Sequence, residues 1–180
     1  GKPAENMHYA NADITQSDWA DIVKAKNFDP KKKTICLVQG SCYLPQAGLV
    51  DFFLNLQKLL SIDSQIVIGL LAPPGSSLQT KADVKVCHSL GAVYQTVVPA
   101  ADAPQFLFDK GFYPTAQFPQ AALDAELGLT ARQSKSNKRQ LNGFVARLRR
   151  DGDVVPSLLE IPAMKVDWKH EEVKQVGNKI

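Results

Sequence analysis

Short apolar segments alternate with amphipathic segments along the first hundred residues, and this alternation most constrains the fold. Two compact, β-branched runs, 34–38 and 66–71, are each suited to one buried strand, and a third run covers 92–98. Between these runs the apolar spacing predicts helices over 45–60 and 80–90. Short links between strand, helix and next strand favour parallel strands with right-handed crossovers. We therefore expect an α/β fold with a three-layer parallel sheet of at least three strands, in the order βαβαβ.

The flanking segments divide the chain around this core. We expect a flexible N-terminus over 1–13, an α/β core over 14–100, a mostly helical extension over 101–162 and a charged tail over 163–180. Thr15 suits the N-cap of a first helix, with Ile14 and Trp19 placed as a hydrophobic staple. In the extension a helix from Thr130 to about Gly152 is predicted from an apolar stripe with helical spacing, made of Leu141, Phe144, Val145 and Leu148.

Composition narrows the class of protein. With 44% hydrophobic and 22% charged residues the chain is typical of an ordinary globular protein. Its apolar runs are far shorter than the roughly 20 residues of a membrane span. The chain starts at Gly1 without Met, so we expect a fragment of a larger protein. The cysteines Cys36, Cys42 and Cys87 form no CxxC pair, and we expect a cytoplasmic chain or the cytoplasmic part of a membrane-attached protein. Scattered histidines predict no metal site, and no cofactor is predicted.

Candidate ligand-binding residues follow the predicted strands, because ligands of parallel α/β sheets bind beyond the carboxyl ends of the strands. After the first strand come Gln39, Gly40, Ser41 and Cys42, and after the second come Ser76 and Ser77. Ser41 does not lie in the Gly-x-Ser-x-Gly pattern of a serine nucleophile, and Cys42 has no evident basic partner that would activate its thiol. We favour a structural role in which Gly40 permits a tight turn and Ser41 or Cys42 caps the next helix. A hydrolase using Ser41 or Cys42 remains an alternative.

A basic segment is the main feature outside the predicted core. Seven basic and no acidic residues lie between 132 and 150: Arg132, Lys135, Lys138, Arg139, Arg147, Arg149 and Arg150. On a helix they would form a cationic face opposite the apolar stripe, suited to an acidic partner. The order of a helix, Gly128, a second helix and a Gly152-containing hairpin over 119–155 resembles a winged helix-turn-helix. That resemblance implies contacts of Arg132, Lys135, Lys138 and Arg139 with nucleic acid.

A second resemblance concerns residues 34–98. The run Cys36-Leu37-Val38-Gln39, then Leu44-Pro45, the Leu/Phe-rich helix and Ile66-Val67-Ile68-Gly69-Leu70 resembles the cytoplasmic C-terminal domain of uncharacterised bacterial membrane proteins found beside predicted GTPases. No functional residue follows from this resemblance.

Three functions fit these observations. The first is a non-enzymatic interaction or regulatory module that binds an acidic protein partner through the basic helix. The second is nucleic-acid binding through 119–155, and the third is the hydrolase. We rank them in that order, so that an enzyme is the less favoured class.

Overall fold

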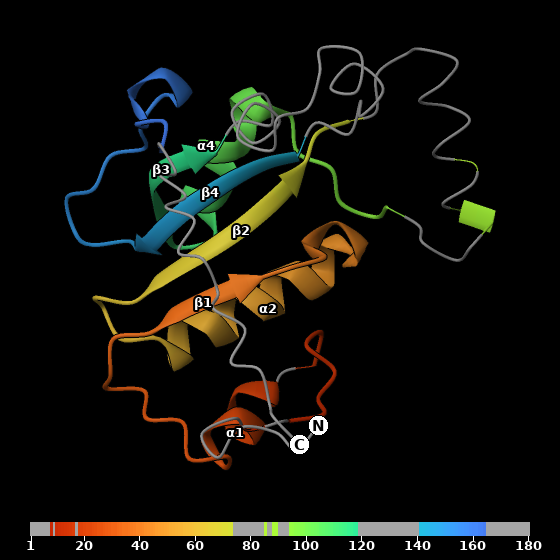
Figure 1. Cartoon of the computed structure of the whole chain (residues 1–180), viewed down its shortest axis with the longest axis vertical. Coiled ribbons are helices and arrows are strands. Elements are labelled where there is room, and N and C mark those ends of the chain that lie inside the picture. Colours follow the sequence, from red (N-terminus) through yellow and green to blue (C-terminus); the bar gives the residue numbers. More distant parts are fainter. Residues whose placement is uncertain are drawn as a thin grey trace, which may run out of the picture.

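The computed structural model describes residues 8, 10–16, 18–73, 85, 88–89, 94–118 and 141–164. In this part of the chain four strands form one sheet in the order β1-β2-β4-β3 (Figure 1). The strands are β1 (Ile35–Val38), β2 (Gln65–Leu71), β3 (Phe112–Phe118) and β4 (Leu141–Leu148). The helix bounds are Trp19–Lys24 for α1, Gln46–Leu59 for α2 and Ala103–Asp109 for α4. Residues far apart in the sequence therefore share one sheet.

The β1-α2-β2 unit confirms the first part of the predicted pattern. β1 and β2 pair in parallel, with Ile35 opposite Gln65 and Val38 opposite Ile68. Helix α2 begins after Pro45, whose fixed φ suits the start of a helix. Its apolar residues recur with helical spacing, and Leu49, Phe52, Phe53, Leu56 and Leu59 are buried. Burial of this stripe against the sheet supplies the driving force for the crossover.

The other two strands give the sheet antiparallel pairs, so the expectation of a purely parallel sheet is wrong. β4 pairs antiparallel with β2, from Gln65 opposite Arg147 to Leu71 opposite Leu141. β3 is antiparallel to β4 and lies at the far edge of the described sheet. The sheet is therefore mixed, with β4 inserted between β2 and β3.

The predicted helix over Thr130–Gly152 is also wrong where the structure describes it, because residues 141–148 form β4. In β4, Phe144 and Ala146 are fully buried and alternate with partly exposed neighbours, which is the period of a strand. Gly143 disfavours a helix and suits this strand: a Cβ there would lie 3.3 Å from Phe118 Cβ. Pairing with β2 and β3 on both sides outweighed the helical spacing.

Within 101–162 the described residues contain α4 but no long helix, which corrects the mostly helical extension. Residues 112–118, inside this expected extension, form strand β3. A chain segment at 157–164 lies along β3: Gln117 N–H donates to Pro162 O, and Met164 N–H donates to Gln117 O. The Gln117 side-chain amide donates to the carbonyls of Leu158 and Ile161. These bonds satisfy backbone groups at the β3 edge of the sheet.

The third predicted strand, 92–98, is not a strand of the sheet in its described part, 94–98. Instead the Val98 N–H donates to Leu71 O at the end of β2, 2.8 Å away. This segment leads into α4, which ends at Asp109, shortly before Gly111. It lies beside the carboxyl ends of β1 and β2, where the candidate site is found.

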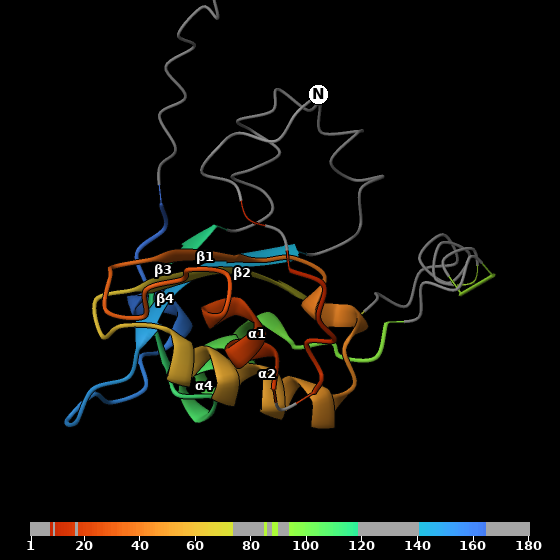
Figure 2. The same cartoon turned by 90° about the horizontal axis from the view of Figure 1, so that it is seen from below.

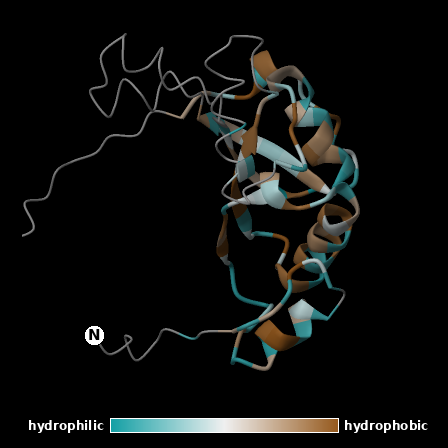
Figure 3. Ribbon diagram, turned by 90° about the vertical axis from the view of Figure 1, so that its right-hand side faces the viewer, coloured by the Kyte–Doolittle hydropathy of each residue, from teal (hydrophilic) through white to brown (hydrophobic). Residues whose placement is uncertain are grey.

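Helices α1, α2 and α4 lie on the same face of the sheet (Figure 2). Phe53 is at the centre of the resulting core, with its ring near those of Phe52, Phe106 and Phe112. In Figure 3 the helices carry both hydrophobic and hydrophilic stretches, as expected for helices with one buried side. On the opposite face of β1, Ile35 is 70% and Leu37 is 65% exposed. The expectation of a first strand buried on both faces, within three layers, is therefore wrong for the described residues.

Candidate functional site

The carboxyl ends of β1 and β2 meet at one edge of the sheet because the two strands are parallel. Three segments gather there, and together we call them the rim: Gln39–Leu44, Ala72–Pro73 and Tyr94–Thr96. The first follows β1, the second follows β2, and the third is joined to the first by hydrogen bonds. These three segments contain no lysine, arginine, histidine or acidic residue. The described rim segments therefore offer a ligand aromatic, amide, hydroxyl and backbone groups.

The turn after β1 depends on Gly40. Its φ of 76° and ψ of 17° lie in the left-handed region, which glycine adopts most readily. A 3₁₀ turn follows at Ser41–Tyr43, in which Tyr43 N–H donates to Gly40 O over 3.0 Å. The predicted tight turn at Gly40 is confirmed. The predicted cap is wrong, since α2 has Pro45 at its N-cap and no side-chain capping bond.

Ser41 links the turn to β2. Its side chain is 3% exposed, and its hydroxyl donates to the carbonyl of Gly69 over 2.8 Å. No described histidine or carboxylate hydrogen-bonds to this hydroxyl. A serine nucleophile needs a neighbouring base and access to substrate. The hydrolase hypothesis therefore fails at Ser41, which holds the turn in place.

Cys42 shows no activation as a nucleophile. Burial raises the pKa of its thiol, whereas a reactive cysteine needs a lowered one. Its carbonyl instead accepts the N–H groups of Gln95 (2.8 Å) and Thr96 (3.1 Å). The residue therefore joins two segments of the rim, and the hydrolase hypothesis fails here as well.

The third segment is attached to the turn by side chains as well. Thr96 is buried and its hydroxyl donates to Leu44 O over 2.8 Å, while the Gln95 amide donates to Tyr43 O over 2.9 Å. With the two bonds to Cys42 O, four hydrogen bonds join these segments. These bonds fix the turn after β1 and the Tyr94–Thr96 segment relative to each other.

Two tyrosines that sequence reasoning missed give the rim its accessible surface. The ring of Tyr43 stacks on that of Tyr94, with centroids 5.5 Å apart and an interplanar angle of 25°. Tyr43 is 43% exposed, and Gln39 nearby in the turn is exposed. The available sequence signal was the aromatic residue directly after Gly40-Ser41-Cys42, but its partner is 51 positions further along the chain and no local spacing reveals it.

Two of the described arginines are held by contacts within the protein. Arg147 in β4 forms a two-point ion pair with Asp153, at 2.7 and 2.8 Å, and its guanidinium lies 4.5 Å from the Tyr113 ring centroid. Arg149 lies over the Phe108 ring and donates to Phe108 O. They therefore do not form one face of a helix.

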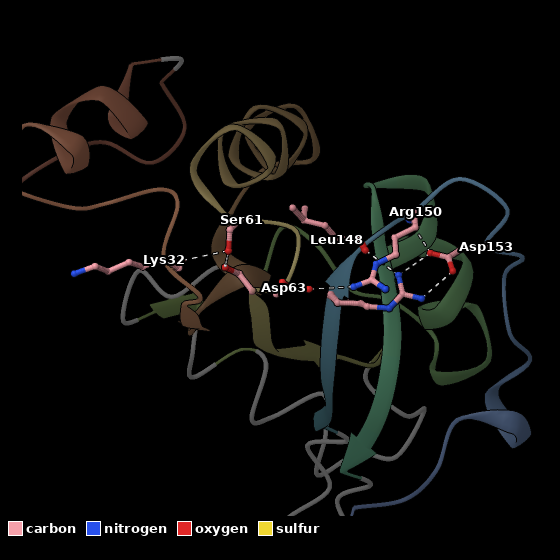
Figure 4. A network of polar contacts seen from close by, with 8 residues as sticks. Lys32, Ser61, Asp63, Leu148, Arg150 and Asp153 are labelled. Atoms are coloured by element: carbon pink, nitrogen blue, oxygen red, sulfur yellow. Dashed lines mark hydrogen bonds and ion pairs between the residues drawn. The ribbon is translucent and has the colours of Figure 1, made fainter.

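Arg150 belongs to the same group of contacts, shown in Figure 4. Its N–H donates to Asp153 over 2.7 Å, and its guanidinium lies 3.3 Å from an Asp63 carboxylate oxygen. Asp153 thus receives bonds from Arg147 and Arg150, which lower its pKa to about 2. The predicted cationic helix face is wrong for the three described arginines.

The remaining candidates lie outside the described residues: Ser76, Ser77, Arg132, Lys135, Lys138 and Arg139. In the described ranges no cluster of three or more histidine, cysteine or acidic side chains could hold a metal ion. None of the helices in the part of the chain that the structure describes has the length and hydrophobicity needed to cross a membrane.

Comparison with known proteins adds information about the first third of the chain. Residues 1–56 match the sequence model of the leucine carboxyl methyltransferase family. This segment includes α1, β1 and the Gly40 turn. No curated protein matches the chain significantly.

Two solved structures resemble the fold. A DUF574 family protein from Streptomyces avermitilis has a TM-score of 0.52 at 14% identity, over 77% of this chain and 53% of its own. The magnesium protoporphyrin IX methyltransferase of Synechocystis PCC 6803, solved with bound SAH, has a TM-score of 0.40 at 16% identity, over 77% and 49%. The first similarity shows the fold, and the second is too low to support a conclusion. The chain spans about half the length of these structures.

These findings contradict the favoured functional interpretation. The segment that forms β1 and the first part of the rim matches a family of enzymes, which points away from a non-enzymatic interaction module. The nucleic-acid alternative fails as well. Residues 141–148 were expected in the second helix of a winged helix, but they form strand β4. The preference against an enzyme was based on the absence of a complete catalytic set, the missing Met and the basic helix, and the family match overturns it.

Proposed function

We propose that this chain functions in methyl transfer from S-adenosylmethionine, with a carboxyl group as the acceptor, and that the rim contacts the methyl donor or the acceptor. The observation that carries the proposal is the match of residues 1–56 with the leucine carboxyl methyltransferase family. The matched segment builds β1 and the turn at Gly40, which is the strand end where an α/β sheet offers a ligand site.

The residues of the rim fit such a ligand in chemical type. S-adenosylmethionine has a planar adenine ring and a sulfonium cation, and aromatic faces bind both flat rings and cations. Tyr43 and Tyr94 offer such faces, and Gln39 and Gln95 offer amide groups for hydrogen bonds. When bound, S-adenosylmethionine supplies an electrophilic methyl group.

The contribution of this chain is positioning. The Ser41–Gly69 bond and the two bonds to Cys42 O fix the turn that carries Tyr43, so its ring needs little reordering when a ligand binds. An acceptor carboxylate is already ionised at neutral pH and needs no general base from the rim. The absence of an activated serine or cysteine among the described rim residues is therefore compatible with this chemistry.

Binding of S-adenosylhomocysteine to the 180-residue chain, measured by calorimetry, tests the proposal. Tyr43→Ala should weaken binding about two- to tenfold, since aromatic stacking is worth about 0.5–1.5 kcal/mol. Tyr43→Phe keeps the ring and should bind nearly as well as the unmodified chain. Transfer is then followed as base-labile methyl ester formed on a leucine-terminated peptide from methyl-labelled donor. Saturable binding that is the same in a folded Tyr43→Ala variant, or no binding at all, would contradict the proposal.

A further inference from the structure

A hollow lies at the opposite end of β1 from the rim. It has a volume of about 490 Å³ and is bounded by the turn after α1 and by the residues that lead into β1. Its charged and apolar lining includes Lys26, Lys32, Lys33, Asp29, Val23 and Phe28. The volume falls within the roughly 300–1,000 Å³ of small-molecule sites. Because β1 has only four residues, at about 3.3 Å each, the hollow and the rim are separated by roughly the length of that strand.

Three lysines give this hollow a net positive charge. Lys26, Lys32 and Lys33 are exposed, and no described carboxylate lies within ion-pair distance of their ammonium groups. Asp29 is the only carboxylate among the described lining residues, and its Oδ1 accepts the N–H of Lys31 over 3.0 Å. Figure 4 shows the Lys32 side chain extending away from Ser61, whose hydroxyl donates to the Lys32 carbonyl.

The walls of the hollow are held in place. Lys32 O accepts the Ser61 hydroxyl over 3.2 Å, and Thr34 N–H donates to the buried Ser64 hydroxyl over 3.0 Å. On the other wall, Lys26 N–H donates to Val23 O, and Asn27 follows in the left-handed conformation with φ 65°. Both lysine-bearing segments are therefore fixed by backbone bonds that do not use the ammonium groups.

The chemistry of the lining identifies a class of ligand. Several lysines bind phosphate as point charges, and three around one hollow suit a multiply charged phosphate. Phe28 and Val23 are partly buried and add apolar surface to the same hollow, which suits an organic group attached to the phosphate. We propose that this hollow binds a small organic phosphate, with its phosphate among Lys26, Lys32 and Lys33 and its organic part against Phe28 and Val23. The proposal does not depend on the methyl-transfer proposal.

Calorimetric titration of the 180-residue chain with phenyl phosphate tests this site. The triple variant Lys26→Gln, Lys32→Gln and Lys33→Gln should bind at least about tenfold more weakly, since charge-assisted bonds to phosphate are lost. A matched control removes the same charge elsewhere: Lys31→Gln, Lys58→Gln and Lys85→Gln, all exposed and outside the lining. The control should bind within about twofold of the unmodified chain, apart from the weak effect of net charge.

Inorganic phosphate serves as the second probe. It should bind about tenfold more weakly than phenyl phosphate, because it leaves Phe28 and Val23 in water. Equal affinities for the two probes would overturn the assignment of an organic phosphate. Equal losses in the triple variant and the control would show that net charge alone attracts phosphate and would overturn the site. Failure of phenyl phosphate to bind at low ionic strength would overturn it directly.

Discussion

The β1-α2-β2 unit and the β3-β4 pair belong to one sheet, yet they are held together differently. The first depends on an amphipathic helix that buries Leu49, Phe53 and Leu56 against the strands. The second is held by strand pairing and by polar contacts such as the Arg147–Asp153 ion pair and the bonds of Gln117. The basic residues of the sequence differ in the same way between the two parts. Basic residues near β4 are part of its support, whereas the lysines that lead into β1 form no ion pair with a described carboxylate.

The largest expected effect tests whether these two parts form one cooperative unit. Phe53 on α2 is 1% exposed and its ring is 5.6 Å from that of Phe112 on β3. Phe53→Ala should lower the free energy of unfolding by about 3–5 kcal/mol, because it leaves a cavity where the two parts meet. Urea denaturation followed by fluorescence and circular dichroism gives the value.

Leu54→Ala is the matched control, since this neighbouring side chain is 47% exposed. Its cost should stay below about 1 kcal/mol, because little apolar area is lost from the core. Similar losses in both variants would contradict the described packing of α2. Separate transitions by the two probes would contradict a single cooperative unit.

A smaller effect concerns the junction between α4 and β3. Gly111 has φ 82°, and a Cβ there would lie 2.7 Å from the side-chain amide of Gln57 on α2. Gly111→Ala should cost about 2 kcal/mol or more, from backbone strain of about 1–2 kcal/mol together with the displaced Gln57. That amide normally donates to Lys110 O over 3.0 Å. Thermal or urea unfolding measures the loss.

Gly152→Ala separates the two contributions. Gly152 has φ 86°, and a Cβ added there would meet no described atom within 4 Å, so the variant should show backbone strain alone. A loss at Gly111 no larger than that at Gly152 would contradict the close contact with Gln57.

The smallest effect is a dependence of stability on pH in the β3-β4 part. Hydrogen bonds from Arg147 and from the Arg150 backbone lower the pKa of Asp153 from 3.8 to about 2. A lowered pKa means that the carboxylate stabilises the folded state fully above about pH 5, and that this contribution is lost as the pH falls through 4 towards 2. Asp153→Asn should therefore flatten the fall in urea midpoint over that range. Asp151→Asn, at an exposed position nearby, is the control, and equal flattening in both variants would contradict the ion pair.

The sequence was sufficient for elements whose stabilising contacts are encoded by local pattern. β1, α2 and β2 were predicted close to their observed bounds, and so was the turn at Gly40. In each case periodic apolar residues or a glycine at a turn carried the information. The N-cap predicted at Thr15 was wrong even in this part of the chain. Helix α1 begins after Asp18, and the Thr15 hydroxyl donates to Asp13 instead.

The place of the candidate residues in the fold was predicted, but their contacts were not. The strand-end rule correctly brought Gln39, Gly40, Ser41 and Cys42 to the edge of the sheet. Whether Ser41 was a nucleophile depended on its bond to Gly69, 28 residues away, which no motif encodes. The Tyr43–Tyr94 pair likewise arises only when the 94–98 segment lies beside the turn.

Local pattern by itself thus predicted a helix-covered parallel β1-β2 pair and the tight turn after β1. Tertiary structure decided that 141–148 is a strand, that it runs antiparallel between β2 and β3, and that its Arg147 pairs with Asp153 within the chain. The physical reason is that a strand obtains its hydrogen bonds from distant segments, whereas a helix obtains them from its own residues. Leu141, Phe144, Val145 and Leu148 satisfy the spacing of a helix, and only the neighbouring strands determine that they form a sheet.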